Sequence, residues 1–188
     1  MKSVLILVLL AFSLCLPGGW EKRSINENSL DIDQSFRLAC SEFIKSNGGD
    51  QDDCIRLTVY SQVVNGMNYN ITFIDSNAEF PTIQGYRINK SLGNSNDNQF
   101  TIVEHEEFEA TNGLIAPNDS KFTDLEINLY KLLKKSEEEL NFISFVYPIE
   151  DYATNFFVIS ANTASGDHEY ILCQDKDSEE YYSFAKLK

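Results

Sequence analysis

The sequence predicts an α+β protein, a fold class in which helices and antiparallel strands occupy separate segments of the chain. Residues 30–46 place apolar side chains at three- to four-residue spacing, as in a helix with one buried face. Several stretches of alternating apolar and polar residues follow, which is typical of half-buried strands. The same order returns after residue 120. Each half is therefore expected to lay one face of an antiparallel sheet on its helix.

The first predicted helix, residues 30–46, has recognisable ends. Asp31 and Asp33 lie in its first turn, where acidic side chains complement the helix dipole. The run Asn47-Gly48-Gly49 follows the last turn and favours termination. The side chains of the expected apolar face are Phe36, Ala39, Cys40, Phe43 and Ile44.

The strands expected after this helix form an antiparallel meander. In residues 54–60 every second side chain is apolar, from Ile55 to Val59. A stretch rich in Gly, Asn and Ser, residues 93–98, supplies the turn before the last strand. The predicted strands cover residues 54–60, 69–73, 82–90 and 99–108, and residues 20–28 are a poorer candidate for a strand before the helix.

The second half repeats this order. Thr123 and Glu126 form a capping box, which predicts the start of a second helix. The apolar stripe of that helix comprises Phe122, Leu125, Leu129, Leu132, Leu133 and Leu140. Strands are predicted over residues 142–147, 154–160, 169–174 and 181–187. The second half is therefore interpreted as a diverged copy of the first, with an unrelated α+β domain as the alternative.

The first fifteen residues are typical of a secretory targeting segment. Lys2 supplies a basic start, residues 4–12 are almost unbroken apolar sequence, and Ser13 and Cys15 provide small residues at a cleavage site. The apolar run is shorter than a membrane span. We therefore expect a signal peptide over residues 1–15 and a chain that is secreted or enters the secretory–lysosomal lumen. A retained signal anchor is the alternative.

Charge and composition exclude several classes of function. The net charge of −14 at pH 7 argues against nucleic acid and against an anionic membrane as partners. The sequence has no metal-ligand spacing, phosphate loop or Ser/His/Asp pattern, so we expect no cofactor and no enzymatic activity. The histidines are His105 and His168, and a pair between His168 and Cys173 would need an orienting group to make a nucleophile.

Three cysteines remain after the targeting segment. In an oxidising compartment they allow one disulfide and one remaining thiol. A bond between Cys40 and Cys54 would tie the middle of the first helix to the start of the next strand. Cys173 would then be buried or linked to another chain. Secretion would also make three Asn-x-Ser/Thr sequons usable for glycosylation, at Asn70, Asn89 and Asn118.

The stretch Gln62–Tyr69 is the most informative part of the chain. Its Asn65-Gly66 pair predicts a hairpin, because these residues tolerate the positive φ of a tight turn. Val63 and Val64 beside an exposed turn indicate a contact surface. The stretch resembles the Gln-x-Val-x-Gly signature of the cystatins, including the Asn-Tyr that often follows it. Residues 39–43 are similar to the helix of that family.

This resemblance implies a cystatin-like domain over residues 16–109, in which a curved antiparallel sheet wraps a long helix. It also implies reversible, competitive inhibition of papain-like cysteine peptidases of the cathepsin type, without a cofactor. Cystatins wedge an N-terminal trunk and two hairpin loops into the peptidase cleft. The peptidase-binding residues expected from the resemblance are Gly18, Gly19, Gln62, Val63, Val64, Asn65, Gly66 and Leu92.

The chain departs from the family pattern in two places. Ser91-Leu92 stands where secreted cystatins usually carry Pro-Trp, and leucine buries less apolar area than tryptophan, so weaker binding is expected. In the second half, residues 110–188, Glu150–Thr154 occupies the place of the signature without its Gln, Val or Gly. That loop is therefore expected to have lost the inhibitory function.

Two alternatives stay open at the level of sequence. The N-terminal trunk is short, and a frayed end is as good an interpretation of residues 16–19. A secreted, non-inhibitory interaction module of cystatin-like fold is the rival function, because fold does not fix function. The intact Gln62–Gly66 loop favours inhibition. Asn47-Gly48 only faintly resembles the legumain-binding loop of some cystatins, and an ordinary helix end is the preferred interpretation.

Overall fold

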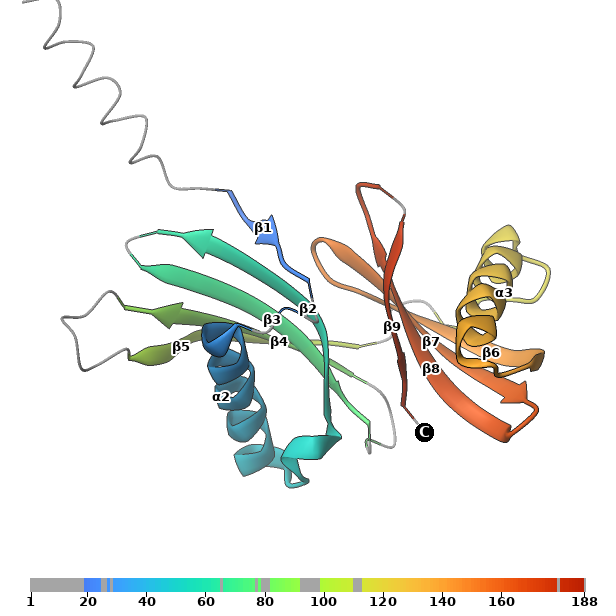
Figure 1. Cartoon of the computed structure of the whole chain (residues 1–188), viewed down its shortest axis with the longest axis horizontal. Coiled ribbons are helices and arrows are strands. Elements are labelled where there is room, and N and C mark those ends of the chain that lie inside the picture. The colour runs from blue at the N-terminus through green and yellow to red at the C-terminus, as the bar shows by residue number, and fades with distance from the viewer. Residues whose placement is uncertain are drawn as a thin grey trace, which may run out of the picture.

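The chain adopts an α+β fold in the computed structural model, with two α-helices and two antiparallel sheets among the residues that the structure describes (Figure 1). Those residues are 19–24, 27, 29–64, 66–76, 78, 82–91, 99–109, 113–178 and 180–187, without the side chains of 182 and 183. The expected signal peptide lies outside them. No helix within these ranges is long and apolar enough to cross a membrane.

The two halves show the same order of elements. The first half contains β1 (Glu21–Lys22), α2 (Leu30–Asn47), the 3-10 turn η1 (Gln51–Asp53), β2 (Cys54–Val63), β3 (Met67–Asp75), β4 (Ile83–Lys90) and β5 (Phe100–Phe108). The second half contains α3 (Ser120–Leu133), the 3-10 turn η2 (Lys134–Ser136), β6 (Leu140–Glu150), β7 (Thr154–Thr163), β8 (Gly166–Asp175) and β9 (Tyr181–Lys186). In each half an α-helix therefore precedes four strands.

The first sheet has the order β1-β2-β3-β4-β5, and helix α2 packs against one of its faces (Figure 1). Phe73 of β3 lies at the centre of this contact. The rings of Phe36 and Phe43 from α2 meet it edge-on, with centroids 6.0 and 5.7 Å away. The other buried side chains of this core are Ile32, Ala39, Cys40, Cys54, Val59, Tyr69, Ile71, Tyr86 and Ile88.

The expected disulfide between Cys40 and Cys54 is present and fixes α2 to the start of β2. Both residues are buried, and Cys40 belongs to the apolar face of the helix. The link closes a loop with a sequence separation of 14 residues. Cys173 lies outside this bond and is buried in β8.

Removal of this disulfide is expected to destabilise the fold. Replacing Cys40 and Cys54 together by alanine should lower the free energy of unfolding by about 2–4 kcal/mol, because the unfolded chain regains the freedom of a closed loop. Urea denaturation of the variant and of the original protein, each with and without reductant, measures this. Reductant should destabilise the original protein and leave the variant unchanged. Equal stability of the two proteins in oxidising buffer would contradict the expectation.

The second sheet has the order β6-β7-β8-β9, with helix α3 on one face. Phe122, Leu125, Leu129 and Leu133 of α3 are buried against the strands. The predicted start of this helix is wrong by a few residues. The N-cap is Asp119, whose side chain accepts a hydrogen bond of 2.8 Å from the backbone N–H of Lys121. This carboxylate caps the helix upstream of the predicted Thr123 box.

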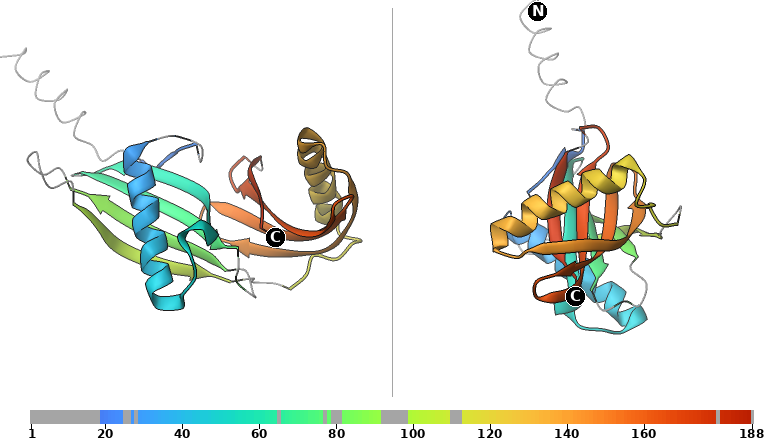
Figure 2. Two further views of the ribbon diagram at one scale, coloured as in Figure 1. Left: turned by 60° about the horizontal axis from the view of Figure 1, so that its bottom comes forward. Right: turned by 90° about the vertical axis from the view of Figure 1, so that its right-hand side faces the viewer.

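The two halves lie next to each other along the longest axis and share a hydrophobic core (Figures 1 and 2). Along β7, Phe157 and Ile159 face α3, so the alternating residues Phe156 and Val158 face the other way. There they pack against the first sheet. The first sheet contributes Leu57, Ile74 and Ile83, and the second contributes Ile149, Phe156, Val158, Ile171 and Cys173.

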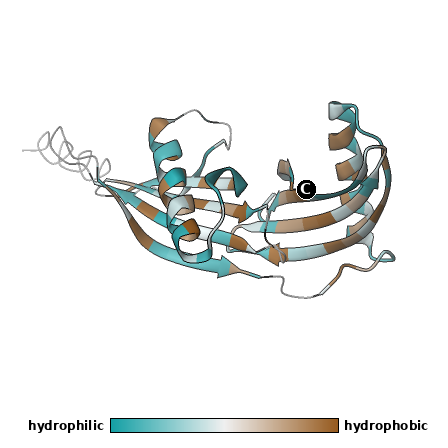
Figure 3. Ribbon diagram, turned by 90° about the horizontal axis from the view of Figure 1, so that it is seen from below, coloured by the Kyte–Doolittle hydropathy of each residue, from teal (hydrophilic) through white to brown (hydrophobic). Residues whose placement is uncertain are grey.

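Apolar side chains therefore occupy both faces of the second sheet. Hydrophobic residues, brown in Figure 3, recur along the strands of both sheets, and those in the shared core lie where the two sheets meet. The contact involves the end of the first sheet at which β2 begins and β3 ends. The other end of that sheet, with the tip of the β2–β3 hairpin, stays clear of the shared core.

Candidate functional site

The tip of the β2–β3 hairpin lies at the end of the first sheet that is opposite the shared core. Its last strand pair joins Val63 to Met67, and the N–H of Val64 donates to the carbonyl of Gly66 over 3.1 Å. Strand β4 ends beside it, since Lys90 pairs with Met67. The predicted hairpin is thus present, and its tip lies next to the end of β4. Asn65 lies outside the described residues.

Gly66 brings the hairpin tip into close contact with β4. Its φ is +132°, a conformation that side chains disfavour, and an ideal Cβ built on it would lie 2.6 Å from the carbonyl oxygen of Lys90. Because this neighbour is a backbone atom within a sheet, it has little room to move. Only glycine fits this position without a shift of the hairpin or of β4.

The valines of the tip differ in exposure. Val63 is 61% exposed although it is a large apolar residue, whereas Val64 is partly buried. Gln62 pairs with Asn68 across the hairpin, and the Asn68 side chain accepts a 2.6 Å hydrogen bond from Asn89 of β4. The tip therefore presents an apolar side chain from a hairpin that neighbouring strands hold in place.

Strand β1 pairs with β2 close to the same tip. Glu21 pairs with Ser61 and Lys22 with Tyr60, in antiparallel register. In this register Trp20 and Gly19, which precede Glu21, lie on the side of β1 that faces the Val63 end of β2. Gly19 is exposed, with no atom within 4 Å of an added Cβ, and Gly18 lies outside the described residues.

The second hairpin, between β4 and β5, begins at the same end of the sheet. The N–H of Ser91 donates to the carbonyl of Gln99 over 3.2 Å and closes its base. Leu92 and the rest of residues 92–98 lie outside the described residues. The base of this loop and the tip at Gly66 thus lie at the same end of the first sheet, and β1 pairs with β2 close to it.

Hydrogen bonds to Asp31 connect this end of the sheet to helix α2. Asp31, in the first turn of α2, accepts hydrogen bonds from the Tyr69 hydroxyl at 3.4 Å and from the Lys90 ammonium. Burial, followed by the charge of Asp31, raises the pKa of Tyr69 to about 12, so the hydroxyl stays protonated as a donor. The sequence indicated only a helix-dipole role for Asp31. Its partner Lys90 is 59 residues away, and local sequence patterns carry no sign of such a contact.

The corresponding turn of the second half, between β6 and β7, is engaged with the first sheet. Asp151 accepts hydrogen bonds from the N–H groups of Ala153 and Thr154, and burial raises the pKa of its carboxyl group. Tyr152 donates a 3.0 Å hydrogen bond to Glu106 of β5, and its ring meets Phe108 edge-on. The turn that takes the place of the signature therefore contacts β5, although the Tyr152 side chain remains largely exposed.

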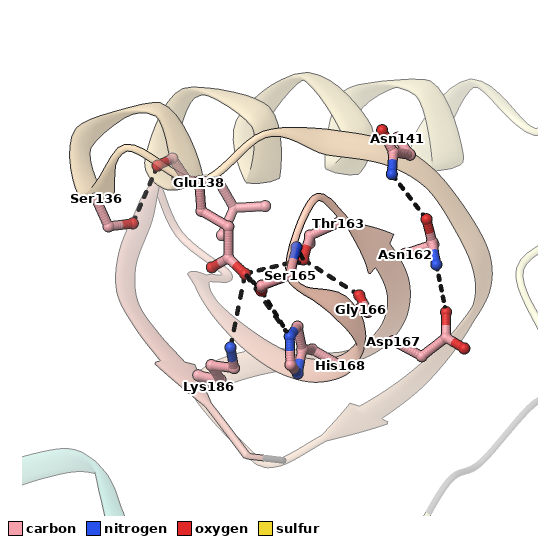
Figure 4. Close-up of polar contacts among 11 residues, drawn as sticks. Ser136, Glu138, Asn141, Asn162, Thr163, Ser165, Gly166, Asp167, His168 and Lys186 are labelled. Atoms are coloured by element: carbon pink, nitrogen blue, oxygen red, sulfur yellow. Dashed lines mark hydrogen bonds and ion pairs between the residues drawn. The ribbon is translucent and has the colours of Figure 1, made fainter.

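A second polar cluster surrounds Glu138 between α3 and β6 (Figure 4). Glu138 accepts hydrogen bonds from Ser165 at 2.6 Å and Thr163 at 2.9 Å, and lies 3.6 Å from the Lys186 ammonium. The bond from Ser165 contributes most to holding its pKa at about 2, against the effect of burial. The cluster joins the segment before β6 to the β7–β8 turn.

This cluster brings a serine, a histidine and a carboxylate together without the geometry of a catalytic triad. His168 Nε2 lies 2.9 Å from Ser165 Oγ and 3.8 Å from Glu138 Oε1. In a triad the carboxylate orients the base through its other nitrogen. His168 and Cys173 are five residues apart on β8, so their side chains point to opposite faces of the strand. They form no nucleophile–base pair.

No family model matches the chain, and no curated protein matches it in sequence. Among the described residues, no group of three or more His, Cys, Asp and Glu side chains could hold a metal ion.

Proposed function

We propose that the protein is a secreted, reversible and competitive inhibitor of papain-like cysteine peptidases. The observation that carries this proposal is the hairpin tip at Val63, Val64 and Gly66, which lies close to β1 and to the base of the β4–β5 loop. An apolar tip flanked by two further segments suits insertion into an elongated cleft. The inhibitor does no chemistry and uses no cofactor.

The physical basis of binding is the exposed valine on a preformed turn. A fixed hairpin loses little conformational freedom on binding, so most of the contact energy contributes to affinity. Burial of Val63, which is 61% exposed, in an apolar groove contributes about 1.5–2 kcal/mol at most. Gln62 would supply polar contacts, Gly18 or Gly19 would let the N-terminal segment turn away from the catalytic cysteine, and Leu92 would add an apolar contact.

We further propose that both halves are cystatin-like and that the second is a diverged, non-inhibitory copy. A helix followed by a four-stranded antiparallel meander occurs in each half, in the same order and with the helix on one sheet face. The β6–β7 turn, which replaces the signature loop, lies against β5. One chain is therefore expected to bind one peptidase, through the first half.

The test is a titration of papain activity with the secreted protein and with two matched variants. Val63→Asp places a charge at the hairpin tip and should weaken inhibition by about 1.5–3 kcal/mol, roughly 10- to 150-fold. Val103→Asp is the control, because Val103 is 59% exposed on β5 and lies away from the hairpin tip. It should inhibit like the original protein.

The outcome separates the proposed function from its rival. Reversible inhibition at one peptidase per chain, lost only in Val63→Asp, supports an inhibitor that works through this hairpin. No inhibition by the original protein at micromolar concentration would overturn the proposal and leave a non-inhibitory interaction module. Equal inhibition by both variants would place the contact surface elsewhere.

A further inference from the structure

We propose that the second half braces strand β1 and so directs Trp20 and Gly19, which precede it, toward the end of the sheet that carries Val63 and Gly66. The inference rests on the inhibitory function proposed above and gives the second half a positioning role in it. An ion pair between Lys22 of β1 and Asp175 of β8 carries it, together with the groove on which Trp20 lies.

Strand β1 is short and lies at the edge of the first sheet. It has two residues, both exposed, and two register pairs with β2 at the sheet edge. Arg23 extends the contact with two hydrogen bonds. Its backbone N–H donates to the carbonyl of Val59 over 2.8 Å, and its guanidinium donates to the Ser61 hydroxyl over 2.8 Å. Such a short edge strand is expected to fray without further support.

The second half supplies that support across 153 residues of sequence. The Lys22 ammonium lies 3.1 Å from Asp175 Oδ2, with side chains 32% and 23% exposed. The other carboxylate oxygen of Asp175 accepts hydrogen bonds from the N–H groups of Asp177 and Ser178. The acceptor is therefore fixed by its own turn before Lys22 binds it, which lowers the entropy lost in forming the pair.

The turn that carries Asp175 is itself anchored. The N–H of Lys176 donates to the carbonyl of Ala153, and the Lys176 ammonium donates to the carbonyl of Asp151 at 2.7 Å. These bonds join the β8–β9 turn to the β6–β7 turn. The β6–β7 turn contacts β5 through Tyr152, and the shared core lies beneath both turns. Asp175 is thus positioned relative to the first sheet by a continuous set of contacts.

Trp20 completes the arrangement on the N-terminal side of Lys22. Its ring lies 5.7 Å from the guanidinium carbon of Arg87, a distance suited to a cation–π contact. Trp20 lines a groove of about 450 Å³ between the halves, to which Tyr152 and Asp177 of the second half contribute. Because β1 is antiparallel to β2, fixing Trp20 and Lys22 directs Gly19 toward the tip.

The proposal predicts how the contact responds to substitution. Lys22→Gln and Asp175→Asn each remove the ion pair, and asparagine keeps an oxygen for the turn. Each variant should raise amide hydrogen exchange of residues 19–24 about two- to fivefold, as expected for a surface pair. Acrylamide should also quench Trp20, the only tryptophan of the chain, more strongly. The double variant should match the single variants, because all three lack the same contact.

Lys135→Gln is the matched control. Lys135 is an exposed lysine of η2 with no ion pair to the described residues, so its removal should leave residues 19–24 unchanged. Exchange in Lys22→Gln equal to that in Lys135→Gln would overturn the brace. Additive effects in the double variant would also overturn it, because the two residues would then act independently.

These measurements need no peptidase, so they judge the brace even if the protein inhibits none. If the original protein did not inhibit papain, only the proposed function would be overturned. Where the original protein inhibits, release of β1 should speed dissociation of the complex about two- to fivefold. Freed β1 residues with unchanged dissociation would overturn the aiming role of the second half.

Discussion

Substitution of Gly66 by alanine is expected to distort the hairpin tip and to weaken inhibition strongly. At φ +132° an alanine costs about 1–3 kcal/mol of backbone strain. The added Cβ would also lie 2.6 Å from the Lys90 carbonyl, so that β4 or the hairpin must move. Such overpacking costs about 1–3 kcal/mol more. Inhibition constants against papain and urea denaturation curves measure the two consequences.

Gly166 offers a matched control for the strain alone. It lies at the start of β8 with φ +129°, close to the value at Gly66, and no atom lies within 4 Å of its added Cβ. Gly166→Ala should therefore lose stability through strain while inhibition stays unchanged. The difference between the two variants isolates the close approach of Gly66 to β4. Equal losses of stability, with inhibition kept in Gly66→Ala, would contradict a need for this tight tip.

Local patterns were sufficient to predict most elements of the fold. The helix expected over residues 30–46 spans Leu30–Asn47, and the strand expected over 82–90 spans Ile83–Lys90. Side-chain periodicity reports burial on one face and needs no knowledge of the partner. Strand ends were harder. The strand predicted over residues 54–60 continues to Val63, because pairing with β3 extends it to the hairpin.

The contact between the halves could not be predicted from periodicity alone. A sign of it was nevertheless present in the run Phe156–Ile159, whose four consecutive apolar residues are typical of a strand buried on both faces. The run does not indicate which residues pack against the second face of the strand. Leu57, Ile74 and Ile83 cover it, and they are more than 70 residues upstream.

For the candidate site too, local sequence patterns predicted contacts between neighbouring residues but not contacts between distant segments. The tip at Val63–Gly66 was identifiable, because a hairpin turn and its apolar neighbours are adjacent in sequence. The link from Asp31 to Tyr69 and Lys90 was not, since it joins a helix start to two strands. The register of β1, which places Glu21 and Lys22 beside Ser61 and Tyr60 of β2, also follows only from the assembled sheet.

The shared core implies that the two halves unfold together, and Phe156→Ala is expected to show this. Phe156 belongs to the second sheet, is fully buried, and packs in the cluster that includes Leu57 and Ile74 of the first. Its truncation should lower the free energy of unfolding by about 3–5 kcal/mol through lost burial and a cavity. Urea unfolding should be followed by circular dichroism for the whole chain and by pulsed amide hydrogen exchange of helix α2, which among the described residues packs only on the first sheet, for the first half.

Coincident transitions by the two probes, both shifted by Phe156→Ala, are the expected result, because a cavity in a common core weakens both sheets at once. Phe142→Ala is the matched control. Phe142 is 53% exposed on β6, so removing the same ring there should change stability by only about 0.5 kcal/mol. A shift in circular dichroism without a shift in the exchange of α2 would mean that the first half folds independently. The second half would then lack the rigid attachment that a brace on β1 requires.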